Sequence, residues 1–132
     1  MKPYPYQEKG VEWLLAGRRR YLADEAGLGK TVQVAFALAR LEDCGYAMVV
    51  CPASVRGHWQ RILEELVPDK RWTIYSYAGL TRRGFPGVVQ PSTVILDEAH
   101  MVKSPAAKRT KVALQYAAAA DRAWLLSATP TP

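Results

Sequence analysis

Short apolar runs alternate with segments of helical periodicity along this chain of 132 residues. The runs are rich in Val, Ile and Leu and show no polar alternation, which is typical of strands covered on both faces. Five strands are predicted, at residues 20–24, 46–51, 72–77, 93–97 and 122–127. Because helical segments separate most of these strands, the pattern predicts an α/β fold with a mainly parallel sheet.

The helical segments carry recognisable start and stop signals. Helices are predicted at residues 6–16, 30–43, 54–67 and 104–120. Ser54 and Ser104 are expected as N-caps, and Gly17 as the C-terminal stop of the first helix. One apolar stripe runs along the third helix: Val55, Trp59, Ile62, Leu63 and Leu66. Residues 79–91 are rich in turn formers, and no helix is predicted there.

The composition fits one globular domain. Hydrophobic residues make up 49% of the chain, which argues against disorder. No apolar run approaches the ~18 residues of a membrane span, so no membrane partner is expected. Cys44 and Cys51 form no C-x-x-C pair and are interpreted as small core or loop residues in a reducing, intracellular compartment. That compartment is the cytoplasm of a prokaryote or of a virus-infected cell, or the nucleus of a eukaryote.

The chain is basic, with 18 Lys and Arg against 12 Asp and Glu and a net charge of +6. This balance suits a nucleic-acid partner, but many solvated surfaces are equally basic. Charge alone therefore leaves the partner open.

A candidate phosphate loop, "ADEAGLGKT", joins the first strand to the second helix at residues 23–31. Gly29, Lys30 and Thr31 complete the pattern G-x-x-x-x-G-K-[ST], while Asp24 replaces its first glycine. Gly27 and Gly29 let backbone N–H groups approach an anion at the start of a helix. Lys30 would reach the phosphates and Thr31 would hold Mg²⁺. The alternative is a glycine-rich turn that only opens a helix.

Two further segments end strands on polar residues. In "VILDEAH", Asp97 is placed to bind Mg²⁺ and Glu98 to orient and deprotonate a water molecule. His100 is open to interpretation as a capping or core residue. In "LLSATP", Ser127 and Thr129 bring hydroxyls to another strand end. Each segment alone is weak evidence for a nucleotide site, but the two segments together with the phosphate loop are a specific signal.

The segments, in this order, resemble the motifs of superfamily-two helicases. "PYPYQEKGVEWLL", "ADEAGLGKT", "VVCPASVRGHW", "YSYAGL", "LDEAHMVKSPAAKRTK" and "LLSATPTP" are similar to the Q motif, motif I, motif Ia, the motif after it, motif II and motif III. Residues 3–132 resemble the first RecA-like lobe of the Swi/Snf-type DNA-translocating ATPases, nearest the annealing-helicase-like members. The resemblance implies a three-layer P-loop NTPase domain whose motif III strand lies between the motif I and motif II strands.

The resemblance also implies a site for ATP and Mg²⁺. Gln7 would recognise adenine, and Asp24 becomes a family feature of the loop. Thr31 and Asp97 would hold the metal, and Lys30, Asp97 and Glu98 would carry the catalysis. The phosphates would rest on Gly27, Leu28, Gly29, Lys30 and Thr31.

A DNA contact follows from the same resemblance. Pro52, Ala53 and Ser54 would touch the DNA backbone, with Arg56 and Lys103 as nearby cations. The residues expected to couple the nucleotide to DNA and to a second lobe are His100, Ser127, Ala128 and Thr129.

Two departures from the family pattern shape the expected function. The stretch between motifs Ia and II is shorter than usual. The second RecA-like lobe, which carries the arginine finger in the family, is absent, so residues 1–132 are expected to be a truncated ATP-binding lobe. The second lobe would be supplied downstream in the sequence or by another chain.

The leading hypothesis is a lobe of an ATP hydrolase that drives DNA translocation or remodelling. The isolated chain is expected to bind ATP with little turnover. The alternatives are a nucleotide-binding module without catalysis, an unrelated P-loop NTPase such as a small kinase, and an interaction protein that kept an inherited fold.

Overall fold

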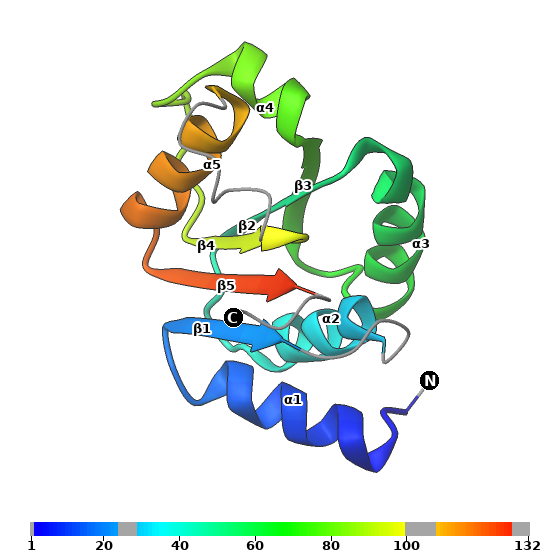
Figure 1. Cartoon of the computed structure of the whole chain (residues 1–132). Helices are drawn as coiled ribbons and strands as arrows, with labels where there is room; N and C mark the ends of the chain where they lie inside the picture. Colours follow the sequence, from blue (N-terminus) through cyan, green and yellow to red (C-terminus); the bar gives the residue numbers. More distant parts are fainter. Residues whose placement is uncertain (1, 24–28, 100–107, 128–132) are drawn as a thin grey trace.

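A five-stranded sheet forms the centre of the computed structural model, which describes residues 2–23, 29–99 and 108–127 (Figure 1). The strands are β1 (Arg19–Ala23), β2 (Tyr46–Cys51), β3 (Arg71–Ser76), β4 (Thr93–Leu96) and β5 (Arg122–Ser127). They are ordered β1-β5-β4-β2-β3, and all four pairings are parallel. The predicted fold class and the predicted place of the motif III strand, β5, between β1 and β4 are therefore confirmed.

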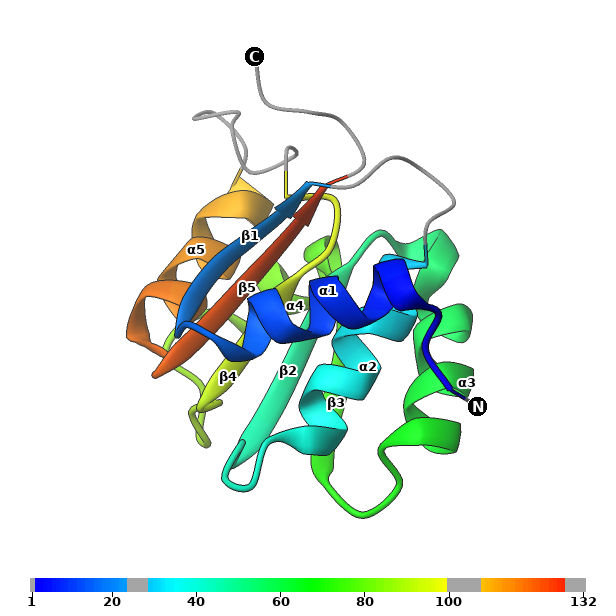
Figure 2. The ribbon, with the colours of Figure 1, turned by 90° about the horizontal axis from the view of Figure 1, so that it is seen from below.

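The helices cover both faces of the sheet, which explains the continuous apolar runs in the strands. The helices are α1 (Pro5–Leu15), α2 (Lys30–Arg40), α3 (Arg56–Leu66), α4 (Tyr77–Arg83) and α5 (Lys108–Ala119). Helices α4 and α5 lie on one face, and α2 and α3 lie on the other, with α1 packed outside α2 (Figure 2). No helix in the described part of the chain is both long and apolar enough to cross a membrane.

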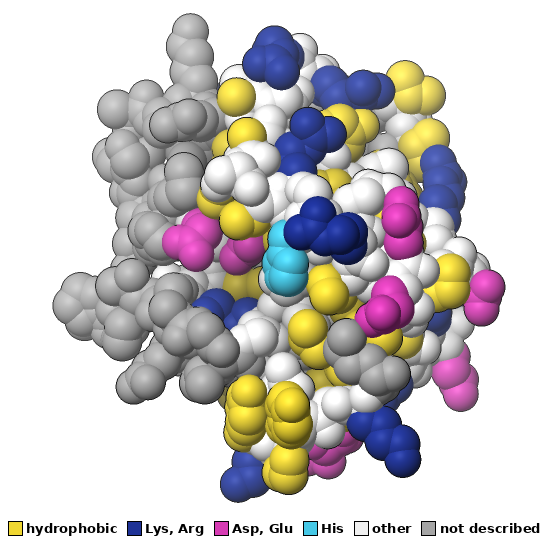
Figure 3. All heavy atoms as spheres, turned by 90° about the vertical axis from the view of Figure 1, so that its right-hand side faces the viewer, with side chains coloured by type: hydrophobic (Ala, Val, Ile, Leu, Met, Phe, Trp, Pro, Cys, Tyr) yellow, Lys and Arg dark blue, Asp and Glu magenta, His cyan; other side chains and the backbone are white. Residues whose placement is uncertain are grey.

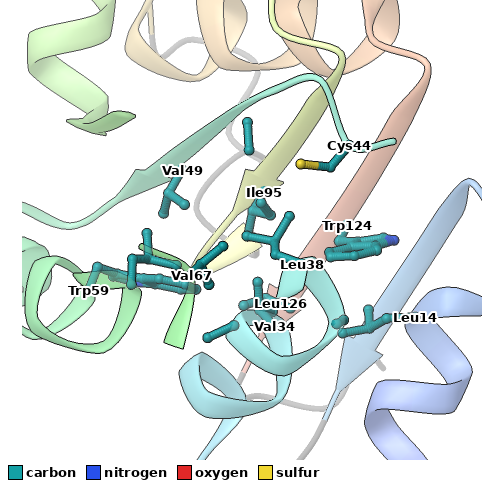
Figure 4. Packing of buried hydrophobic residues seen from close by; sticks show 14 of the residues in the cluster. Leu14, Val34, Leu38, Cys44, Val49, Trp59, Val67, Ile95, Trp124 and Leu126 are labelled. Atoms are coloured by element: carbon teal, nitrogen blue, oxygen red, sulfur yellow. The ribbon is translucent and has the colours of Figure 1, made fainter. Parts of the chain in front are cut away.

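Two apolar clusters hold these layers together. The cluster under α1, α2 and α3 contains Trp59 of α3 and Trp124 of β5, which lie at opposite sides of it with Ile95 of β4 between them (Figure 4). The cluster under α4 and α5 contains Tyr77 of α4, and Val94, Leu96 and other residues at alternate strand positions. Because consecutive strand residues point to opposite faces, each strand contributes to both clusters. Cys44 and Cys51 are buried and free, as predicted.

The sequence-predicted helix signals were wrong in three places. Ser54 does not cap α3; it lies in a 3₁₀ turn, Ala53–Val55, and the cap residue is Val55. Helix α4 occupies part of the segment predicted to contain only turns, and Ser76 caps it by accepting a hydrogen bond from the Gly79 backbone N–H at 3.0 Å. Gly17 follows α1 without a left-handed backbone, and Ala16 ends the helix. The predicted cap Ser104 lies outside the described residues.

Candidate functional site

The carboxyl ends of β1, β5 and β4 meet at one edge of the sheet, where parallel strands collect ligand-binding groups. Ala23 pairs with Ser127, and Leu96 pairs with Leu125 in the next strand. Helix α2 starts at Lys30, whose charge acts on Asp97 directly after β4. Ser127 is fully buried at the end of β5. The structure thus brings together groups that the sequence places far apart.

Gly29 precedes the first residue of α2, at a position where a side chain would be unfavourable. Its backbone is left-handed, with φ of 71° and ψ of 46°. A Cβ at this position would lie 2.5 Å from the Nε2 atom of Gln7. The side-chain amide of Gln7 therefore lies against the N-terminus of α2, where the positive end of the helix dipole favours anions.

Helix α1 holds Gln7 in this place. The Tyr4 backbone N–H donates to the Oε1 atom of Gln7 at 2.9 Å. Arg40 of α2 donates two hydrogen bonds to the Glu8 carboxylate, and the bond with Arg40 lowers the pKa of Glu8. A Cβ on Gly10 would lie 1.7 Å from Oε1 of buried Gln33, so a larger residue at position 10 would displace the Gln33 amide.

Asp97 is held as a fixed carboxylate. Its Oδ2 atom accepts a hydrogen bond from the Trp59 indole Nε1–H at 2.9 Å. Its Oδ1 atom accepts one from the Glu98 backbone N–H, also at 2.9 Å. Burial is the main cause that raises the pKa of Asp97, while the bond from Trp59 and the charge of Lys30 oppose that rise. A buried acid of this kind is suited to a cation partner.

The turn after β4 has an unusual backbone. Glu98 has a φ of 56°, a left-handed conformation that costs a residue with a side chain about 1–2 kcal/mol. Two backbone hydrogen bonds fix Asp97, the residue before Glu98. The Asp97 N–H donates to the Val50 carbonyl at 2.8 Å, and the Asp97 carbonyl accepts from the Tyr77 hydroxyl at 2.6 Å. The surrounding structure therefore holds Glu98 beside Asp97.

Sequence reasoning missed the partners of Asp97. Trp59 was assigned to an apolar stripe and to the segment that resembles motif Ia, and Tyr77 to a strand end and to the segment that resembles the next motif, in neither case with a contact to Asp97. Burial also raises the pKa of Cys51 to about 12 and raises that of Tyr77, and in both the negative charge of Asp97 adds to the effect. No local pattern marks such contacts, because they depend on how α3 and α4 pack against the end of β4.

The residues predicted to contact DNA follow β2 on the surface. Ala53, Ser54 and Arg56 are exposed, and Pro52 is partly buried. Arg56 also lines a groove of about 320 Å³ between α3 and α4. Several Lys and Arg side chains lie on the upper part of this face of the molecule, with Asp and Glu side chains beside and below them (Figure 3). The other residues lining the groove are Tyr75, Ser76, Gly79, Arg82 and Arg83, of which the two arginines were missed from the sequence.

Several predicted site residues lie outside the described part of the chain. These are Asp24, Gly27, Leu28, His100, Lys103, Ala128 and Thr129. Thr31 is described and lies partly buried in the first turn of α2.

The described residues fit Mg²⁺ bound together with a nucleotide. They contain no group of three or more His, Cys, Asp or Glu that would enclose a metal by itself. Mg²⁺ commonly uses one or two carboxylates together with substrate phosphates. The orientation of Asp97 and the space left by Gly29 are consistent with that arrangement.

Comparison with known families gives a match over residues 6–90, to the SNF2-related domain. A Caenorhabditis elegans protein, the SWI/SNF-related matrix-associated actin-dependent regulator of chromatin subfamily A-like protein 1 homolog, is 36% identical over 96% of this chain and 22% of its own length. The mouse (Mus musculus) DNA annealing helicase and endonuclease ZRANB3 is 33% identical over 98% of this chain and 14% of its own length. The chain thus spans about a fifth or less of these relatives.

Solved structures agree with this match. The Sulfolobus solfataricus SWI2/SNF2 ATPase core in complex with dsDNA superposes with a TM-score of 0.82 and 28% identity, over 98% of this chain and 34% of that one. The UvsW helicase from bacteriophage T4 shares the fold, with a TM-score of 0.76 and 15% identity over 98% of this chain and 53% of that one.

Proposed function

The chain belongs to the SNF2-related domain family, and from that membership we propose that it is the ATP-binding lobe of a DNA-dependent ATPase. The observation that carries the proposal is the approach of Gln7 to Gly29 at the sheet edge where Lys30 opens α2 and its charge opposes the rise that burial causes in the pKa of Asp97. In the complete protein, ATP hydrolysis would drive translocation along DNA or its remodelling.

Each residue has a distinct role in this proposal. Gln7 binds the base, and residues 27–31 bind the phosphates at the N-terminus of α2. Thr31 and Asp97 hold Mg²⁺, which neutralises charge on the phosphates when it is bound. Glu98 orients the attacking water and accepts its proton. The backbone turn at Glu98 keeps this side chain next to Asp97.

Thermal and urea unfolding with and without Mg²⁺ and ATP tests the nucleotide site. Ligand at about 100 times its dissociation constant should stabilise the fold by about 2.7 kcal/mol. Lys30→Ala should remove most of that gain, since the phosphates lose their cation. Lys111→Ala, which removes an exposed lysine from α5, should retain it. Equal unfolding of all three proteins with and without the ligand would refute the proposed site.

We also propose that DNA binds weakly and through its backbone, across the exposed turn at residues 52–56. The net charge of +6 and the groove lined by Arg56, Arg82 and Arg83 support this proposal. Phosphate contacts release counterions, so the affinity should fall steeply with salt, from micromolar or weaker values. A fluorescence anisotropy titration of duplex DNA checks this, with Arg56→Ala expected to reduce the salt slope by about one. Tight binding that survives high salt would contradict it.

A further inference from the structure

Residues of two helices donate hydrogen bonds to Asp97: Trp59 of α3 to its side chain, and Tyr77 of α4 to its backbone carbonyl. We propose that Trp59 and Tyr77 are positioning residues that hold the Asp97 carboxylate in the orientation that binds Mg²⁺. This inference rests on the proposed function and adds residues to the metal site that neither the sequence motifs nor the family match assigns.

Trp59 sets the rotation of the carboxylate. With Nε1 bonded to Oδ2 and the Glu98 N–H bonded to Oδ1, each oxygen of Asp97 has one fixed donor and keeps further lone pairs for a metal or its water. The indole itself has little freedom, because Trp59 is 0% exposed within the cluster under α2 and α3. The carboxylate is therefore oriented before a metal arrives, as metal ligands commonly are by their hydrogen-bond partners.

Tyr77 fixes the other end of the same residue. It is the first residue of α4 and is 2% exposed, and its hydroxyl donates to the Asp97 carbonyl. The Asp97 N–H is bonded on the opposite side to Val50 of β2. With both peptide groups held, the carboxylate is unable to shift along the strand axis.

The indole of Trp124 shows that a tryptophan is buried in this cluster even without a hydrogen bond to a described group, such as the one from Trp59 to Asp97. Trp124 is also 0% exposed in the same cluster, and no described group accepts a hydrogen bond from its Nε1 atom. The core thus tolerates an unpartnered indole, whereas the indole of Trp59 points at the acid expected to bind the metal. Trp124 also supplies a matched control.

The test compares ATP affinity in Mg²⁺ with ATP affinity in EDTA, measured by isothermal titration calorimetry on the whole chain. Trp59→Phe keeps a buried aromatic ring but removes the pyrrole ring with its N–H donor. It should weaken binding in Mg²⁺ by 10–100-fold, the usual cost of losing such a partner, and leave binding in EDTA unchanged. Trp124→Phe removes an equivalent buried ring edge and should leave both affinities unchanged.

Tyr77→Phe tests the backbone contact, with Tyr116→Phe as its control. The Tyr116 hydroxyl also donates to a backbone carbonyl, that of Gly84, away from the sheet edge that carries Asp97. Tyr77→Phe should reduce only the affinity in Mg²⁺, by less than Trp59→Phe does. A merely structural role would lower melting temperatures without changing the ratio of the two affinities.

A labelled wild-type chain provides a measurement that does not depend on the folding of any variant. Addition of Mg²⁺ to the ATP-bound protein should shift the indole N–H resonance of Trp59 and not that of Trp124. If Mg²⁺ does not change ATP affinity in the wild-type chain, the metal role of Asp97 fails and the positioning role fails with it. If the Mg²⁺ effect is present but persists in Trp59→Phe, or the Trp59 resonance does not move, only the positioning role is overturned.

Discussion

Two residues with left-handed backbones flank the candidate site, one with a side chain and one without. Gly29 opens α2 with a φ of 71°, and Glu98 follows β4 with a φ of 56°. Glycine adopts this conformation without steric cost, whereas Glu98 does so next to an anchored Asp97. At Gly29 the side chain of Gln7 adds a second restriction, because it occupies the space of a Cβ.

A Gly29→Ala substitution should therefore destabilise the fold by more than the backbone alone requires. The left-handed conformation costs alanine about 1–2 kcal/mol, and the new Cβ also displaces the Gln7 amide. Urea denaturation should show that the loss is smaller when Gly29→Ala is made in a Gln7→Ala chain. Equal losses in both backgrounds would mean that Gln7 does not lie against this turn.

Residue by residue, the site was predictable where its signal is local. The loop from Gly29 to Thr31 and the pair Asp97 and Glu98 are recognisable because chemistry requires those residue types next to one another. The roles of Trp59 and Tyr77 were not predictable. A tryptophan in an apolar stripe and a tyrosine at a strand end are both expected as ordinary core residues. Their hydrogen bonds exist only once α3 and α4 pack around β4.

At the scale of elements, the strands were predicted to within one residue at either end. Burial on both faces produces short apolar runs rich in β-branched residues, bounded by turn residues, which mark the strands. Helix α4 was missed because its 7 residues include Gly79 and follow β3 without a loop. So short a segment shows hardly two turns of periodicity, and its start depends on one cap, Ser76.

Removal of that cap should destabilise the fold. Ser76→Ala takes away the acceptor for the Gly79 N–H and should cost about 1 kcal/mol of unfolding free energy in urea. Ser54→Ala is the matched control, because Ser54 is exposed and does not cap α3. An equal loss in both variants would show that the Ser76 bond contributes nothing specific.

At the scale of the whole molecule, this lobe is expected to bind ATP but hardly to hydrolyse it. In the proposed function Asp97 holds the metal and Glu98 orients the water, but the charge that develops on the γ-phosphate needs a further cation. We propose that a second RecA-like lobe supplies an arginine for this purpose, a contribution on the order of 10³–10⁵ in rate. In this proposal Lys30 is not free for that purpose, because it binds the phosphates.

Steady-state ATPase measurements with and without duplex DNA check this expectation. Turnover should stay near the level of a Glu98→Gln control in both conditions. Robust DNA-stimulated turnover that Glu98→Gln abolishes would contradict it, and would mean that another copy of the chain supplies the missing cation.

The pairing of β1 with β5 also determines when the site is able to form during synthesis. Strand β1 is made early, yet its only partner among the described strands is β5, the last of them to be made. Parallel pairing between such distant segments is slow, because the long intervening chain must first be closed into a loop. Until β5 leaves the ribosome, β1 has no neighbouring strand, whereas β2, β3 and β4 are already able to pair with one another. A nascent chain that stops before Arg122 thus carries the candidate phosphate loop but lacks the strand that holds β1 in the sheet.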